Sequence, residues 1–261
     1  MTLQTISLDV SARGVATLLL NRPERGNAFD QAMLNELGRE FAALAADDRV
    51  RIVVLRGSGK HFCTGADLAA REPEVSPAAQ TGATTARSSL FDVLVALDTL
   101  PKPTVAVVNG GAIGGGAALA ACCDVVIAAE DAFFSVPEVR VGMAPLGVAA
   151  FIIRAIGHRA FRRYGLSGER ITAAEALRLA LAHEVCPAPA LDETLLRIAD
   201  ALLHGAPGAI RELKEAAAHY ASPPLSAIVA NRPPAHREKT PEMLEGFASF
   251  REKRKPRWYP E

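Results

Sequence analysis

The glycine-rich segment Asn109–Gly116 restricts the fold of this chain more than any other stretch of its sequence. It follows the apolar run Thr104–Val108 and leads into the small-residue run Ala117–Cys123. Because glycine has no Cβ and tolerates positive φ, we expect a tight turn between a buried strand and a buried helix. The whole stretch is nearly uncharged, but its glycines and the polar Asn109 argue against a membrane span.

A glycine-rich turn before a helix also occurs at nucleotide-phosphate sites. The glycines here match neither GxGxxG nor GxxxxGK, so we expect no dinucleotide or P-loop site. Free amides at a helix start can still stabilise negative charge, and a second candidate amide lies in Gly65–Leu68. Two amides that converge on one carbonyl oxygen form an oxyanion hole. Close packing of the helix on a strand is the simpler role of the same glycines.

Charge and cysteine content exclude several classes of function. The 29 basic and 29 acidic residues give zero net charge, which leaves no overall basic field for nucleic acid or an anionic membrane. The start, Met1–Asp9, has neither a basic nor an apolar leader region. The four cysteines form no CxxC or Cys/His cluster, so we expect reduced, buried thiols and no metal. We predict a cytoplasmic protein that binds neither nucleic acid nor membrane.

Hydrophobic periodicity predicts strands followed by helices. Strands are expected at 6–10, 15–20, 51–56, 104–108, 124–129 and 132–136, the first two as an antiparallel hairpin. Helices are expected along Phe29–Leu44 and at 89–100, 117–123, 148–156, 159–166, 172–181, 191–204, 207–220 and 241–252. Asn27, with Asp30, is expected to cap the first helix. The stretch 71–88 is predicted to be a surface loop.

Short motifs in a fixed order resemble the crotonase, or enoyl-CoA hydratase/isomerase, superfamily. The matching segments are Asn21–Ala28, Gly59–Leu68, Lys102–Gly110, Gly114–Gly116, Cys123–Asp124, Pro137–Val139 and Phe250–Lys255. The resemblance implies an α/β fold with a crotonase-like ββα spiral core, which binds acyl-CoA and carries the catalytic site, at 1–195. It further implies a C-terminal helical trimerisation region at 196–261, in a homotrimer or a dimer of trimers.

The resemblance also implies an acyl-CoA thioester substrate, whose coenzyme A is part of the substrate, so that no separate cofactor is needed. The oxyanion amides correspond to Ala66 and Gly115. Residues expected to contact the substrate or its coenzyme A are Arg25, Lys60, Asp67, Leu68, Gly116, Phe250 and Lys253. The last two lie in a basic C-terminal run, a local site for phosphate in a chain of zero net charge.

One carboxylate stands where the best-known hydratases of this family have two. Their second glutamate corresponds to Glu138, and their first to Ala118, which cannot transfer a proton. Glu138 is therefore the candidate general acid/base, and an apolar pocket would raise its pKa. A surface ion pair with Arg140 or Arg159 is the alternative. A single base suits a Δ3,Δ2-enoyl-CoA isomerase, which moves a proton between C2 and C4.

Other segments favour hydration. Ala121–Ala129, Pro137–Gly142, Arg154–Tyr164 and Ser167–Arg178 resemble the bacterial methylglutaconyl-CoA and isohexenylglutaconyl-CoA hydratase-like branch, which shares the small residue at 118. The first choice is hydration of a 2-enoyl-CoA, including branched or carboxylated ones, whose carboxylate would meet Arg140 or Arg154.

The sequence disfavours three further classes of protein. A non-catalytic acyl-CoA binder is disfavoured by Glu138, and an RNA-binding relative by the neutral charge. A hydrolase is disfavoured because no GxSxG motif is present. The six histidines are scattered, and we expect them in loops or at the edge of the core.

Overall fold

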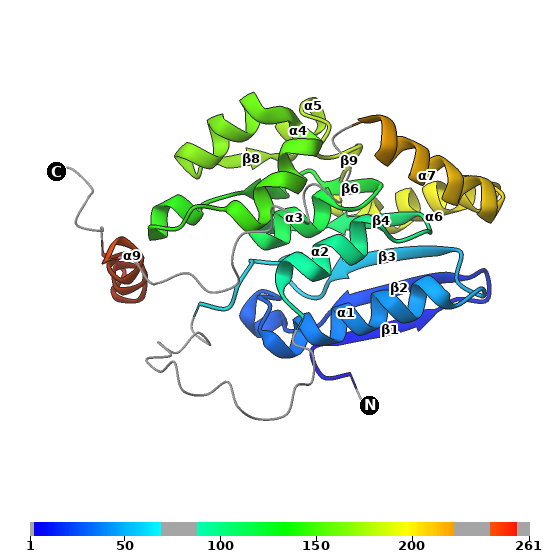
Figure 1. Cartoon of the computed structure of the whole chain (residues 1–261), viewed down its shortest axis with the longest axis horizontal. Helices are drawn as coiled ribbons and strands as arrows, with labels where there is room; N and C mark the ends of the chain where they lie inside the picture. Colours follow the sequence, from blue (N-terminus) through cyan, green and yellow to red (C-terminus); the bar gives the residue numbers. More distant parts are fainter. Residues whose placement is uncertain (1–2, 69–87, 222–240, 255–261) are drawn as a thin grey trace.

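The computed structural model describes residues 3–68, 88–221 and 241–254, which form two β-sheets surrounded by helices (Figure 1). The strands are β1 Ile6–Val10, β2 Val15–Leu20, β3 Ile52–Gly57, β4 Thr104–Val108, β5 Gly111–Ile113, β6 Val125–Ala129, β7 Phe133–Ser135, β8 Arg170–Thr172 and β9 Glu184–Cys186. The α-helices are α1 Gln31–Ala46, α2 Leu90–Asp98, α3 Gly115–Ala121, α4 Leu146–Ser167, α5 Ala173–Arg178, α6 Leu191–Leu203, α7 Pro207–Ala221 and α9 Pro241–Glu252. Short 3-10 helices are η1 Pro23–Arg25, η2 Glu138–Val141 and η3 Ala188–Ala190.

The larger sheet has the order β1-β2-β3-β4-β6-β9. The strands β1 and β2 pair antiparallel, with Ile6 opposite Leu20, which confirms the expected hairpin. All other neighbours in this sheet pair parallel. Every residue of β4 is buried, as its continuous apolar sequence predicts for a strand covered on both faces.

The strands from β4 to β7 alternate between the two sheets. β4 belongs to the larger sheet and β5 to the smaller one before α3 follows, and β6 and β7 repeat this division. The smaller sheet has the order β5-β7-β8. A bridge between Cys63 and Ala112 extends it to the chain that follows β3. This repetition confirms the α/β fold and the ββα spiral that the family resemblance implied.

Several local predictions differ from the structure. The strands β5, β8 and β9 have three residues each, too few for a periodic signal. The helix expected at 117 begins at Gly115. The expected cap at Asn27 was wrong, because Asp30 is the N-cap of α1 and accepts a hydrogen bond from the Met33 amide. The two helices expected at 148–156 and 159–166 are confirmed, because α4 is kinked between them at Gly157, whose φ of 76° and ψ of 157° are not helical.

Some predictions remain outside these observations. Nearly all of the loop predicted at 71–88 lies outside the described residues. The helix α9 packs on η2, where a Cβ at Gly246 would lie 2.4 Å from the carbonyl carbon of Val141. The division at residue 195 and the trimer stay predictions.

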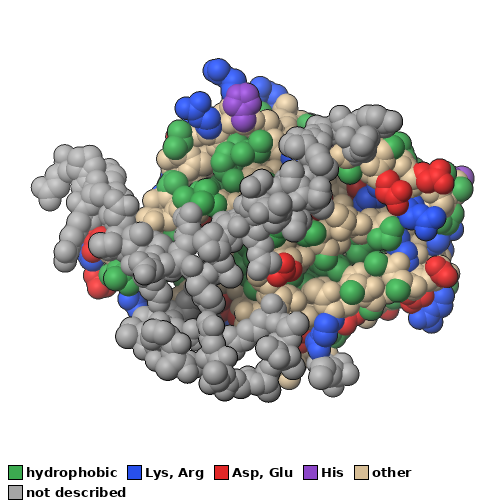
Figure 2. Space-filling model, viewed as in Figure 1, with side chains coloured by type: hydrophobic (Ala, Val, Ile, Leu, Met, Phe, Trp, Pro, Cys, Tyr) green, Lys and Arg blue, Asp and Glu red, His purple; other side chains and the backbone are tan. Residues whose placement is uncertain are grey.

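The surface of the described residues carries mixed features. No described helix is both long and apolar enough to cross a membrane. Basic and acidic side chains both lie on the face shown in Figure 2.

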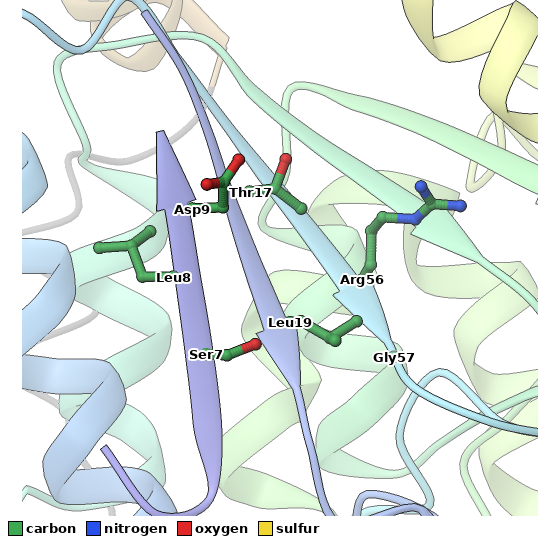
Figure 3. Close-up of a pocket in the computed structure, with 7 residues that line it drawn as sticks. All are labelled: Ser7, Leu8, Asp9, Thr17, Leu19, Arg56 and Gly57. Carbon is green, nitrogen blue, oxygen red and sulfur yellow. The ribbon is translucent and has the colours of Figure 1, made fainter. Parts of the chain in front are cut away.

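A hollow on β1–β3 is lined by Ser7, Leu8, Asp9, Thr17, Leu19, Arg56 and Gly57 (Figure 3). None of these is a site residue expected from the sequence, so the candidate active site lies elsewhere.

The buried Asn27 joins the loop after β2 to the loop after β3. Its side-chain carbonyl accepts from the Arg22 amide at 2.9 Å, and its side-chain NH₂ donates to the carbonyls of Ser58 and His61 at 2.8 and 2.7 Å. Its φ of 56° is left-handed, a conformation that Asn tolerates better than most residues. The side chain thus holds both loops in place.

Replacing Asn27 by Gly is expected to lower the free energy of unfolding by about 2 kcal/mol, because three backbone groups lose their partner. Asn27→Ala should cost about 1 kcal/mol more, because alanine resists the left-handed conformation. Urea titration measures both values. Equal stability of wild type and Asn27→Gly would mean that other contacts hold the loops together.

Candidate active site

The chain after β3 runs between Phe29 and the start of α3. The Phe29 amide donates to the Gly65 carbonyl at 2.8 Å, and the Asp67 amide donates to the Phe29 carbonyl at 3.1 Å. In a parallel bridge the residue between those two partners directs its own amide to the other side. The N–H of Ala66 therefore points away from Phe29.

The first turn of α3 packs against this segment from the opposite side. A Cβ at Gly65 would lie 3.7 Å from the Gly115 nitrogen, and a Cβ at Gly116 would lie 2.2 Å from the Cys63 carbonyl oxygen. The Gly115 amide belongs to the first helical turn and has no acceptor within the helix. The structure thus brings the segments of Ala66 and Gly115 together, and their action as an oxyanion hole stays a prediction.

Apolar side chains cover the Gly115 backbone. A Cβ there would lie 2.4 Å from Cζ of Phe29 and 2.9 Å from Cδ2 of Leu90. The sequence pattern predicted Phe29 at the start of the first helix and Leu90 in the second, and it predicted neither at the site. Phe29 lies just before α1. Apolar cover excludes water, which strengthens an interaction between an amide and a developing negative charge.

Glu138 begins η2, which is joined to β7 by Val136 and Pro137, and it faces Gly114. A Cβ at Gly114 would lie 2.7 Å from Oε1 of Glu138, and Gly114 has φ 55°. Oε2 is buried without a hydrogen-bond partner among the described residues. The alternative of a surface ion pair with Arg140 or Arg159 is therefore wrong. The Arg140 guanidinium donates to the Ser167 carbonyl instead, and Arg159 is exposed.

Burial raises the pKa of Glu138 above its ordinary value of 4.5, although a backbone hydrogen bond acts in the opposite direction. A carboxylate shielded from water binds a proton more readily than one in water, because burial disfavours its charged form. This shift brings the group toward the range in which it can both take and return a proton near neutral pH.

A second carboxylate is missing at the position of Ala118, whose side chain is completely buried in α3. Among acids near it in sequence, Asp124 pairs with Lys214 at 2.5 Å. Glu130 and Asp131 are exposed at a turn, as predicted. None of these acids replaces the missing group.

The predicted substrate-binding residues of the first two loops differ in exposure. Arg25 ends the short helix η1, Lys60 lies in the loop after β3, and both side chains are exposed. The two segments are in contact, since a Cβ at Gly59 would lie 2.9 Å from Cβ of Pro23. Asp67 is buried and pairs with Arg22 at 3.0 Å, so it fixes the loop of Ala66. Leu68 is half-buried. Their contacts with coenzyme A stay predictions.

The remaining predicted residues lie on helices. Gly116 packs on Cys63, which is the simpler role considered for the glycines. Phe250 and Lys253 are exposed at the end of α9. Arg154 pairs with Asp98 at 2.8 Å. Among the described residues no three His, Cys, Asp or Glu side chains gather to hold a metal ion.

Comparisons with known proteins agree on one family. The enoyl-CoA hydratase/isomerase family profile matches residues 11–261. Enoyl-CoA hydratase AFT6-1 of Alternaria alternata is 38% identical over 71% of the chain, which spans 58% of that relative's length. The 2,3-dehydroadipyl-CoA hydratase of Escherichia coli is 33% identical, with 93% of this chain and 94% of the relative covered.

A solved structure agrees with these sequences. The crystal structure of an enoyl-CoA hydratase from Mycobacterium avium subsp. paratuberculosis K-10 superimposes with a TM-score of 0.82. It is 26% identical and covers 99% of this chain and 100% of that one. The similarity therefore includes the region of Glu138 and both glycine-containing segments.

Replacing Glu138 by Gln is expected to raise the free energy of unfolding at pH 8. The unfolded chain ionises this carboxyl near 4.5, whereas burial raises its pKa in the folded state. Ionisation therefore favours the unfolded state above the folded pKa, and the gain from Gln shrinks as the pH falls toward 4.5. Urea titrations of the wild type and of Glu138→Gln, at pH 8 and near pH 4.5, measure this gain in the free energy of unfolding.

The exposed Glu130→Gln serves as the matched control for this comparison. A gain for Glu138→Gln that is the same at both pH values would contradict a raised pKa of Glu138.

Proposed function

This chain belongs to the enoyl-CoA hydratase/isomerase family, and we propose that it hydrates the conjugated double bond of a 2-enoyl-CoA thioester. The observation that carries the proposal is the Glu138 carboxylate beside the start of α3, whose Oε2 is buried without a hydrogen-bond partner among the described residues. Family membership supplies the thioester class, and the site supplies the groups that the reaction needs.

Addition of water to the double bond places negative charge on the thioester oxygen. We propose that the amides of Ala66 and Gly115 donate to this oxygen. Removal of one such donor costs about 10²–10³ in rate in measured cases, so two donors account for a large part of a catalytic effect. The cover of Phe29 and Leu90 over Gly115 supports this role, because it limits the access of water to the backbone of Gly115.

Glu138 is the proton carrier in this proposal. Its ionised carboxylate takes a proton from water as the oxygen bonds to C3, and the resulting carboxylic acid returns that proton to C2 of the enolate. One O–H bond of water and the π bond between C2 and C3 break, while one C–O bond at C3 and one C–H bond at C2 form. The raised pKa of Glu138 supports both steps, because the group is neither too weak a base nor too weak an acid.

An isomerase is the second candidate. Ala118 leaves a single carboxylate, and moving a proton between C2 and C4 needs only one base. The names of the proteins compared above favour hydration, since all three are named hydratases. We keep hydration as the first choice and test the isomerase directly.

A carboxylated acyl chain is the finer proposal. The relative named 2,3-dehydroadipyl-CoA hydratase, together with the likeness to the glutaconyl-CoA branch, supports it. Arg154 is paired with Asp98, so it would meet a substrate carboxylate only by exchanging that partner.

Coenzyme A contacts are proposed at Arg25, Lys60, Phe250 and Lys253. The proposed assembly is a homotrimer or a dimer of trimers.

The wild type is expected to hydrate crotonyl-CoA or 3-methylglutaconyl-CoA, which is measured as a fall in the absorbance of the conjugated thioester. Glu138→Gln should lower that rate about 10²–10⁴-fold, because the variant cannot transfer the proton. Glu130→Gln, at an exposed turn, is the matched control and should keep the wild-type rate.

Unchanged turnover by Glu138→Gln would sink the assignment of Glu138. A gain of conjugation from a 3-enoyl-CoA, without loss from either 2-enoyl-CoA, would replace hydration by isomerisation.

Gly114→Ala is expected to lower kcat by about tenfold or more. A Cβ would lie 2.7 Å from Oε1 of Glu138, so the carboxylate has to move, and misplacement by ~1 Å can cost about 10²-fold. Gly147→Ala is the control, because a Cβ there meets nothing within 4 Å. Circular dichroism of both variants checks folding. Equal kcat for the two would show that Gly114 does not set the position of the carboxylate.

A further inference from the structure

The side chain of His61 connects the two segments that carry the candidate oxyanion amides. The Gly111 amide donates to Nδ1 of His61 at 3.0 Å. This bond requires an unprotonated Nδ1, so the neutral ring carries its proton on Nε2. The main-chain carbonyl of the same residue accepts from Asn27. His61 thus links three stretches of chain that lie far apart in the sequence.

Glycines surround the imidazole. A Cβ at Gly110 would lie 2.9 Å from Nδ1, and a Cβ at Gly26 would lie 3.6 Å from Cδ2. Side chains at these positions would crowd the ring. The loop after β2, the loop after β3 and the turn before β5 therefore meet around this ring.

Backbone hydrogen bonds continue from the ring toward the site. The Phe62 amide donates to Asn109, the Cys63 amide to Gly111, and the Ile113 amide to Cys63, at 2.8, 3.2 and 2.9 Å. One of the two paired segments continues from Cys63 to Ala66, and the other continues from Ile113 to Gly115. A change at His61 therefore alters the start of both segments at once.

We propose that His61 is a positioning residue for the two amides, and that it acts only as the neutral imidazole that accepts from Gly111. The inference rests on the proposed function, because it concerns the same oxyanion site. Protonation would place an N–H against the Gly111 N–H and leave a shielded amide without an acceptor.

The surroundings of the ring favour its neutral form. Burial, followed by the positive charges of Lys60 and Arg170, lowers the pKa of His61 below 6.5. Arg170 reaches this region from β8, where its guanidinium lies 4.0 Å from the centre of the Phe133 ring. Phe133 in turn contacts Gly111, because a Cβ there would lie 2.9 Å from its Cζ.

Two variants separate positioning from mere space filling. In His61→Asn, Oδ1 stands as many bonds from Cβ as Nδ1 does and can accept from Gly111. In His61→Gln the amide lies one carbon further and cannot. The probe is acetoacetyl-CoA, whose enolate carries negative charge on the thioester side and absorbs in the near ultraviolet.

His61→Asn is expected to bind this enolate within about threefold of wild type, whereas His61→Gln binds it about 10- to 100-fold more weakly. Nitrogen-15 spectra of histidine-labelled wild type, assigned by comparison with His61→Asn, should show an unprotonated Nδ1 and a protonated Nε2 at pH 7.5. Enolate affinity of His61→Gln equal to wild type, or a ring protonated at Nδ1, overturns the inference.

The outcome is distinguishable from failure of the proposed function. A wild type that binds the enolate but hydrates no enoyl-CoA overturns the reaction and leaves the role of His61 standing. A wild type that stabilises no enolate overturns both.

Discussion

Direct packing of backbone on backbone, where the segment 63–66 meets the start of α3, is the constraint on which the site depends. Three consecutive glycines allow it for three separate reasons. A side chain at Gly116 would collide with the Cys63 carbonyl, one at Gly115 with Phe29, and one at Gly114 with Glu138. A side chain at Gly116 would therefore separate the helix from the segment 63–66. At Gly115 it would displace the apolar cover of the first amide, and at Gly114 it would displace the Glu138 carboxylate.

The surroundings of this contact are held by neutral polar groups more than by charges. Asn27 and His61 bind backbone groups of neighbouring loops, and the Arg22–Asp67 pair fixes the end of the same segment. Such bonds have a defined direction, which suits a site where the position of an N–H decides its effect. Glu138, the candidate catalytic group, takes no part in these bonds. Burial is the largest influence on its pKa.

Sequence reasoning predicted the elements that carry a long repeated signal. The continuous apolar runs of β3 and β4 and the periodic face of α1 identified parallel strands and a helix correctly. The strands β5 and β8 were missed, because three residues carry no period and β5 lies within the glycine-rich segment. Glu138 was selected through family likeness and the elimination of other acids. The roles of Asn27, His61 and Leu90 depend on contacts between distant segments, which no local pattern encodes.

The alanine at position 118 changes the electrostatics of the site as well as its chemistry. Two carboxylates that share a pocket repel each other when both are ionised, so their protons leave in two coupled steps. Here Ala118 lies in the packed interior of α3, and burial is the largest influence on the pKa of Glu138. A lone carboxylate ionises in one step over a single pH range. In the proposed reaction it therefore has to hold the water, accept its proton and return that proton in succession. The burial that raises its pKa makes this reuse of one group feasible.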